Sequence, residues 1–288
     1  MSDLISELQR LYFLSDQQWL SQESAAGGEA VCTAAGDLTP EVVGQGLAGR
    51  IEVRLKLVDA GDRVRALVLG FARASDWPRV AELYQAVQDD LDLPAPALAV
   101  SGQNGFRLWF SLAEPVPVGL ARAFLDGLRC KYLADMPLAK LELRPDAGSP
   151  AVVKLTPALH RATGKWSAFI DPSLGGMFVD EPGLEMAPSM NQQAHILAGL
   201  AGIKAGEFAR VLHLLQSPAV ADAGDAPKPA LDVPASPAAP SSRLDVGHDF
   251  SDPQSFLLAV MNDPMASAGQ RIRAAKALLP YFAKGQPK

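Results

Sequence analysis

The stretch V-S-G-Q-N-G-F-R-L-W-F-S-L, residues 100–112, decides the fold that we predict for this chain. Two apolar runs flank a four-residue turn that begins at Gly102 and ends at Gly105. The second run alternates, so Phe106 and Arg107 point to opposite faces of a strand. A glycine-rich turn between two strands predicts a tight hairpin. Glycine also lets a backbone approach a phosphate closely, which makes the mouth of the hairpin a candidate binding site.

Composition limits the kinds of partner that the whole surface can attract. The chain has 288 residues, of which 48% are hydrophobic and 20% charged, as in ordinary globular proteins. Its formal net charge of -6 excludes a general attraction to nucleic acid or anionic lipid. Any nucleic-acid site must therefore be a local basic patch.

The sequence contains no sign of membrane insertion or of a metal-binding cysteine motif. No signal peptide opens it, and no apolar run approaches the roughly 20 residues that span a bilayer. Its two cysteines, Cys32 and Cys130, lack the spacing of a metal or redox motif. We therefore expect a cytoplasmic protein without a membrane partner.

Changes in hydrophobic pattern divide the chain into four predicted segments. A tract rich in proline, alanine and serine lacks apolar periodicity, which predicts a flexible linker. The segments are a helical one (1–50), an α/β core (51–215), the linker (216–247) and a helical tail (248–288).

Within these segments the periodicity predicts individual elements. Period-two or continuous apolar runs predict strands at 51–57, 64–71, 95–101, 106–112, 141–143, 152–155 and 167–170. Apolar stripes at helical spacing predict helices at 2–22, 77–91, 118–132, 191–215, 253–260 and 267–284. The sequence E-P-V-P at 114–117 is expected to end the second strand of the hairpin.

The order of these elements over residues 51–171 resembles the catalytic core of the archaeo-eukaryotic primase, or primase–polymerase, superfamily. The hairpin is similar to the S-G-x-x-G-x-H motif of the family, with Arg107 in place of the histidine. K-L-T-P-A-L-H-R-A-T-G-K at 154–165 looks like a loop of the family, and F-I-D ending at Asp171 is similar to its third motif. The resemblance implies an α+β fold with an RNA-recognition-like core, an antiparallel or mixed sheet, flanking helices and a small helical tail.

The first motif of that family is missing from this chain. The family places two aspartates two residues apart on a strand, so that both can hold divalent metals. Gly70 and Ala72 stand at these positions, and neither can bind a metal. Asp171 is the remaining metal or catalytic candidate. The pattern favours a degenerate site over an enzyme, and Mg²⁺ or Mn²⁺ is expected only if activity persists.

Basic residues near the two matching motifs form the candidate nucleic-acid site. The candidate phosphate-binding or nucleic-acid-binding residues are Ser101, Gly102, Asn104, Gly105, Arg107, Lys154, His160, Arg161, Lys165 and Trp166. Trp109 and Trp166 are available in this interpretation to stack on bases. The alternative is a solvated basic loop with both tryptophans in the core, and the sequence does not separate the two.

We therefore predict a nucleic-acid-binding protein from a phage or mobile element, acting on single-stranded or primer-template DNA or RNA. One alternative is a metal-dependent nucleotidyl transferase that is still active and uses Asp171. Another is a phage assembly or packaging adaptor, because residues 256–281 resemble a segment of terminase small-subunit-like proteins. In that case the tail over 248–288 binds a protein partner or a second copy of the chain.

Overall fold

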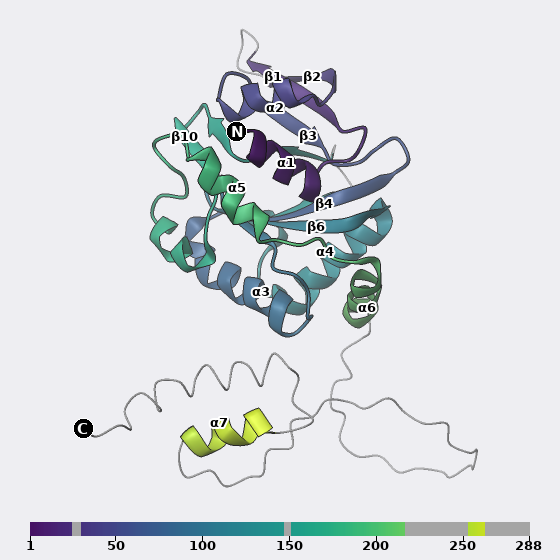
Figure 1. The fold of residues 1–288 in the computed structure, drawn as a ribbon, viewed down its shortest axis with the longest axis vertical. Helices are drawn as coiled ribbons and strands as arrows, with labels where there is room; N and C mark the ends of the chain where they lie inside the picture. The colour runs from purple at the N-terminus through teal and green to yellow at the C-terminus, as the bar shows by residue number, and fades with distance from the viewer. Residues whose placement is uncertain (25–29, 147–150, 217–252, 263–288) are drawn as a thin grey trace. The chain divides into compact units, whose positions relative to one another are not determined.

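The computed structural model describes residues 1–24, 30–146, 151–216 and 253–262 (Figure 1). It divides the chain into two compact units, Met1–Ala219 and Val220–Lys288. The helices of the first unit are α1 (Ser2–Leu11), α2 (Pro40–Leu47), α3 (Trp77–Asp89), α4 (Val118–Tyr132), α5 (Met190–Ala198) and α6 (Ala205–Gln216). Its strands are β1 (Gln18–Ser24), β2 (Ala30–Asp37), β3 (Val53–Lys56), β4 (Arg63–Phe71), β5 (Ala97–Val100), β6 (Phe106–Pro117), β7 (Leu141–Arg144), β8 (Val152–Lys154), β9 (Ala158–His160) and β10 (Lys165–Phe169).

A six-stranded sheet in the order β7-β4-β6-β5-β10-β9 lies at the centre of the first unit. All of its ladders are antiparallel. β4 is buried on both faces from Ala66 onward, as its nearly continuous apolar sequence predicts. The predicted α+β class, with an antiparallel sheet and flanking helices, is confirmed.

One face of this sheet packs against α3, α4 and α6. Leu67 and Leu69 of β4 share a buried cluster with Val80 of α3, Phe124 of α4 and Phe208 of α6. Val80 and Phe124 belong to the apolar patterns that predicted α3 and α4, and both face the sheet as expected.

The opposite face packs under α1 and α5, which run side by side in Figure 1. A second antiparallel sheet, in the order β2-β1-β3-β8, contributes to the same core. Leu8 of α1, Leu55 of β3 and Leu197 of α5 share a buried cluster with Val68 and Trp109 of the larger sheet. The two sheets are thus held together by one apolar core.

A buried side-chain amide joins α5 to the larger sheet. Gln193 accepts a hydrogen bond from the amide of Phe169 at 2.7 Å and donates one to its carbonyl at 2.8 Å. The amide thus satisfies both backbone groups of Phe169, which is buried in β10. This pairing fixes the end of β10 that leads to Asp171.

The predicted helical segment over residues 1–50 is only partly helical. The first helix ends at Leu11, and the chain then forms β1, which pairs with β2 and β3. The prediction failed because tertiary pairing with β3 decides the conformation of this stretch. No boundary separates these residues from the core, since one compact unit runs from Met1 to Ala219.

The second strand of the hairpin is longer than the sequence predicted. β6 continues through E-P-V-P to Pro117, where Arg63 and Val64 of β4 pair with Pro117 and Val116. A register shift between Val64 and Ala66 interrupts the ladder just before this end. Such an irregularity accommodates prolines that would not fit a regular central ladder.

The second unit is described over one helix, α7 (Pro253–Asn262). It agrees with the helix predicted from residue 253. The predicted linker from residue 217 onward, the predicted helix at 267–284 and most of the proposed tail lie outside the described residues. Over the residues that the structure does describe, no helix has the length and apolar character needed to cross a membrane.

Candidate nucleic-acid interface

The glycine-rich turn is fixed by contacts within the hairpin itself. The hydroxyl oxygen of Ser101 accepts hydrogen bonds from the amides of Gln103, Asn104 and Gly105 at 3.1, 3.0 and 3.0 Å. A Cβ atom at Gly105 would lie 2.1 Å from the carbonyl oxygen of Phe71, so only glycine fits there. The loop amides of Gln103, Asn104 and Gly105 already have an acceptor in Ser101 and do not form an open cradle of free donors.

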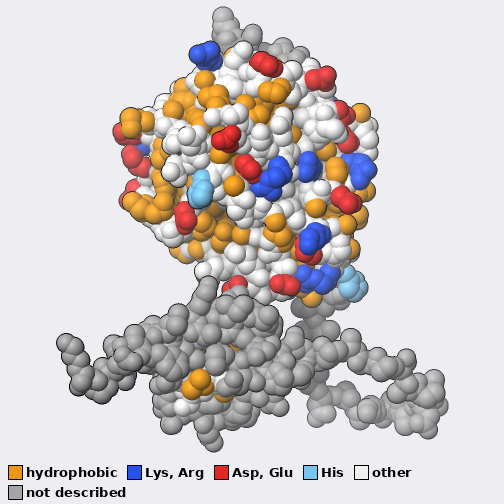
Figure 2. Space-filling model, viewed as in Figure 1, with side chains coloured by type: hydrophobic (Ala, Val, Ile, Leu, Met, Phe, Trp, Pro, Cys, Tyr) orange, Lys and Arg blue, Asp and Glu red, His pale blue; other side chains and the backbone are white. Residues whose placement is uncertain are grey.

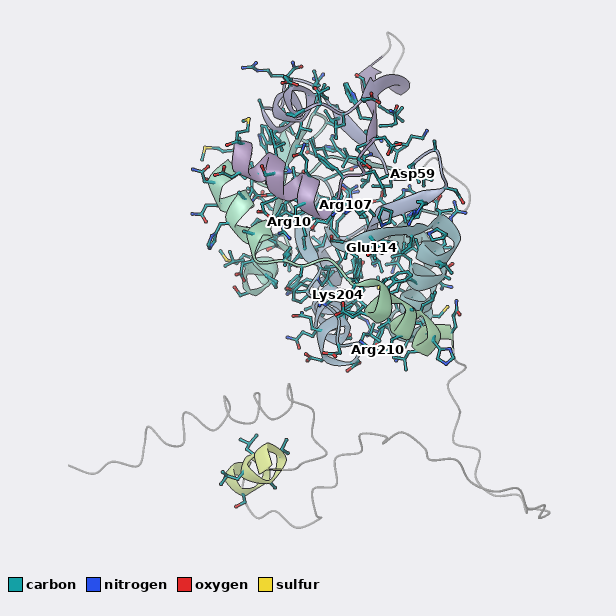
Figure 3. All side chains as sticks on the ribbon, turned by 45° about the vertical axis from the view of Figure 1, so that its right-hand side comes forward. Arg10, Asp59, Arg107, Glu114, Lys204 and Arg210 are labelled. Atoms are coloured by element: carbon teal, nitrogen blue, oxygen red, sulfur yellow. The ribbon has the colours of Figure 1, made fainter. Side chains whose placement is uncertain are left out.

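An ion pair occupies the position where the resemblance places a carboxylate. Gly70 pairs with Arg107 of β6 (labelled in Figure 3) on one side and with Glu142 of β7 on the other. Arg107 donates from Nε and Nη2 to Oε2 of Glu142 at 3.2 and 3.1 Å. A Cβ atom at position 70 would lie 3.1 Å from that oxygen. Glycine at position 70 leaves room for the pair.

The residues around this position do not fit a two-metal site. Glu142 is paired with Arg107 and also lies 3.5 Å from Nε of Arg144. The Oδ1 atom of Asp171 accepts hydrogen bonds from the hydroxyl and the amide of Ser173, at 2.6 and 2.8 Å, and these lower the pKa of Asp171. Nowhere in the described ranges do three His, Cys, Asp or Glu side chains gather as a metal site. Two-metal catalysis needs several free carboxylate oxygens around one position.

The second sheet contributes a further group of charges. Glu52, just before β3, accepts from Nζ of Lys154 at 2.8 Å and lies 3.1 Å from Arg54. The side chains of Glu52 and Lys154 are each 11% exposed, so this pair is largely shielded from water. Together with the groups of the larger sheet it forms what we call the charged cluster: Glu52, Arg54, Arg107, Glu142, Lys154 and His160.

Electrostatic coupling shows that the two sheets bring these groups together. Burial lowers the pKa of Lys154; Glu52 opposes this shift, while Arg54 and Arg107 add to it. Burial also lowers the pKa of His160, and the cations of Lys154, Arg107 and Arg54 lower it further. Arg107 therefore acts on groups from β8 and β9. With His160 neutral, three cations and two carboxylates leave the charged cluster at +1.

The hairpin and the loop after β9 also meet through one side chain. The hydroxyl of Thr163 donates to the carbonyl oxygen of Gly102 at 2.6 Å. The same hydroxyl lies 3.0 Å from Nδ1 of His160. The two stretches that the sequence singled out are thus in direct contact.

Three other predicted residues lie outside the charged cluster. Arg161 donates to the carbonyl oxygen of Arg50 at 3.1 Å, and Lys165 pairs with Glu181 at 3.0 Å. Asn104 is exposed at the turn. These three side chains lie near the charged cluster in the chain and stay candidates for peripheral contacts.

Of the two interpretations that the sequence left open for Trp109 and Trp166, the structure agrees with burial in the core and not with stacking on bases. Trp109 is 2% exposed and packs at 5.3 Å, between ring centroids, from Tyr12. Trp166 is 9% exposed and its ring lies against Gly49, where a Cβ atom would be 2.8 Å away. Both rings fill the core because the strand alternation and the covering elements turn them inward.

Sequence reasoning missed three members of the charged cluster: Glu52, Arg54 and Glu142. Glu52 and Arg54 belong to the alternating polar face of I-E-V-R-L-K-L, so a signal was present. For Glu142, only its pairing opposite Gly70 reveals the contact with Arg107.

A small cavity lies beside the ion pair of Arg107 and Glu142. Its volume is about 240 Å³. The lining comes from the end of β4, the hairpin and the start of β7: Gly70, Phe71, Ala72, Ser101, Gln103, Asn104, Gly105, Phe106, Arg107, Ala139, Leu141 and Glu142.

On the face shown in Figure 2, basic and acidic side chains alternate without a broad basic surface. This agrees with the local character that a net charge of -6 requires of any nucleic-acid site.

Comparison with known proteins finds similarity to solved structures but no matching sequence family. No family model matches the chain, and no curated protein matches it. The structure of the AEP domain of the primase-polymerase (PrimPol) of cyanophage S-2L is similar, with 14% sequence identity and a TM-score of 0.42. The similarity covers 68% of this chain and 97% of that one. At this identity and score it does not establish a shared activity.

Proposed function

We propose that this chain binds the phosphate backbone of nucleic acid at the charged cluster and the neighbouring cavity. The observation that carries the proposal is the meeting of Arg54, Arg107 and Lys154, which come from three strands of two sheets. Cations held close together in a partly buried place are costly unless an anion compensates them. Glu52 and Glu142 compensate them incompletely, which leaves a residual attraction for phosphate.

The side chain of Arg107 is the best placed phosphate ligand of the three. It lines the cavity, and its guanidinium can present two parallel donors to an oxyanion. In the unbound protein Glu142 occupies those donors at 3.1 and 3.2 Å. A phosphate would exchange with this carboxylate or share the guanidinium with it.

The size of the cavity and the burial of the tryptophans favour backbone recognition over base recognition. A volume of about 240 Å³ lies below the range of about 300–1,000 Å³ that is usual for pockets that enclose whole small molecules. The buried rings of Trp109 and Trp166 cannot stack on bases. We therefore expect little sequence preference, and a preference for single strands or primer-template ends.

Fluorescence anisotropy with a labelled thymidine oligonucleotide tests this proposal. Arg107→Ala should weaken binding about tenfold, because a charge-assisted hydrogen bond to phosphate is lost. Arg129→Ala is the matched control, since Arg129 lies in the last turn of α4, on the opposite side of the larger sheet. Equal affinity of both variants for the oligonucleotide would contradict the proposal.

A primer-extension assay with Mg²⁺ and with Mn²⁺ separates binding from polymerisation. We expect binding without extension, because Glu142, the carboxylate beside Gly70, is engaged with Arg107 and Arg144 and does not fit a two-metal site. Extension that depends on Asp171 would instead identify an active nucleotidyl transferase.

A further inference from the structure

The hydrogen bonds of Thr163 fix the protonation form of His160. The Thr163 hydroxyl has one hydrogen to donate, and its carbonyl partners, Gly102 at 2.6 Å and His160 at 3.3 Å, can only accept. The imidazole Nδ1 of His160, 3.0 Å from the same hydroxyl oxygen, must therefore donate to it. The amide of Lys165 is a further donor to this oxygen at 3.3 Å. Neutral His160 thus carries its hydrogen on Nδ1, and Nε2 holds the free lone pair.

Charged groups act on this imidazole from several packed elements. The groups that shift its protonation are Lys154 of β8, Arg107 of β6, and Arg54 and Glu52 of the β3 region. On β10, Lys165 is paired with Glu181, and the charged residue of α2, Glu41, is exposed in its first turn. Burial and the surplus of cations together keep the pKa of His160 below its usual value of 6.5.

We propose that His160 gains a proton at Nε2 when a backbone phosphate enters the charged cluster. The inference rests on the proposed function and adds a means by which the site recognises its ligand. The bound phosphate cancels the repulsion that Arg107, Lys154 and Arg54 exert on an imidazolium. An opposite charge within about 4–6 Å favours the charged form of a titrating group. The bond from Nδ1 to Thr163 is kept in both forms, so the ring gains the proton without turning.

Proton uptake and affinity are coupled by linkage. Because binding raises the pKa of His160, the affinity must rise as the pH falls through the interval between the free and bound values. A shift of one pKa unit corresponds to about a tenfold change in affinity across that interval. The lower end of that interval is the pKa of His160 in the free protein, which lies below 6.5.

Isothermal titration calorimetry of the full chain with a thymidine oligonucleotide that lacks terminal phosphates tests the proposal. Its bases and phosphodiesters do not titrate between about pH 5.5 and about pH 7.5, so proton uptake reports on the protein. Titrations in buffers with low and high ionisation enthalpy should differ by the uptake of up to one proton. His160→Gln should abolish the difference between the buffers.

Two controls make the result specific. His195→Gln on α5 removes a histidine outside the charged cluster and should leave the proton uptake unchanged. The ¹⁵N chemical shifts of His160 should show the hydrogen on Nδ1 in the free protein, and its titration midpoint should rise when the oligonucleotide is bound.

The outcomes separate this inference from the proposed function. Binding that needs Arg107 but takes up no proton would overturn the role of His160 and leave the proposed function intact. Proton uptake that persists in His160→Gln would assign it to another group and would also overturn the role. Absence of any binding by the wild-type chain would overturn both.

Discussion

Two positions on the same face of β6, Trp109 and Arg107, have opposite surroundings although one residue separates them. Trp109 pairs with Val68 across β4 and lies under Tyr12, in the core shared by the two sheets. Arg107 pairs with Gly70 and meets Glu142 and the charges of the second sheet. The alternation of the strand is the same at both. The two positions differ in the elements that cover the strand. A core residue and a residue of the candidate site therefore lie two positions apart on the same face of β6.

The largest effect is expected from a substitution in the hairpin that carries Arg107. In Gly105→Ala the new methyl group would meet the backbone carbonyl of Phe71 at 2.1 Å, so backbone must move. We expect a loss of about 3 kcal/mol in the free energy of unfolding, as for severe overpacking. Urea denaturation followed by circular dichroism measures this change.

Gly119→Ala is the control for that variant. No atom lies within 4 Å of its added Cβ, and the residue is in α4. Alanine should raise the stability by up to about 1 kcal/mol, through its helix propensity. Equal effects of the two substitutions would show that the close approach of the hairpin to β4 is not tight.

Removing the negative charge beside Arg107 should make the surroundings of Arg107 differ even more from those of Trp109. Glu142→Gln changes the net charge of the charged cluster from +1 to +2 and releases Arg107 from its partner. We expect about fivefold tighter binding of a single-stranded oligonucleotide and a stability loss below about 1 kcal/mol. Fluorescence anisotropy measures the affinity.

Glu181→Gln is the matched control, because Glu181 pairs with the peripheral Lys165. It should change the affinity much less than Glu142→Gln does. Weaker binding by Glu142→Gln would mean that the carboxylate orients Arg107 rather than competing with phosphate.

The pH dependence of stability gives a smaller effect. His160 has a pKa below 6.5 in the folded chain and near 6.5 when unfolded. Between these two pKa values the unfolded chain therefore binds more protons than the folded chain. The contribution of His160 to the free energy of unfolding must then fall as the pH drops below about 6.5. His160→Gln should flatten the dependence in urea denaturation, whereas His195→Gln should not. Identical curves for the wild type and His160→Gln would contradict the depressed pKa.

Much of the larger sheet could be predicted because its signals are local. The alternation at 106–112 and the apolar run at 64–71 predicted β6 and β4, and the apolar stripe at 77–91 predicted α3. β1 could not be predicted in the same way, since its sequence is polar and it is a strand through its pairing with β3. Local pattern fails where distant partners decide the conformation.

The sequence motifs predicted the cations of the candidate site but not its carboxylates. The motifs named Arg107, Lys154 and His160, and the structure brings these three into one electrostatic group. The pairing of Glu142 with Arg107 depends on the register of β7 against β4, which no spacing in the sequence reveals. The inward direction of Trp166 likewise depends on its packing against Gly49.

The salt dependence of oligonucleotide binding tests most directly whether the cations contact phosphate. Three phosphate contacts on a single strand predict a slope of about -2 for the logarithm of the binding constant against that of the salt concentration. In the double variant Arg54→Ala/Arg107→Ala the slope should shrink to about -0.7, with one contact left. A slope near zero in the wild type, or one that the double variant leaves unchanged, would contradict the account.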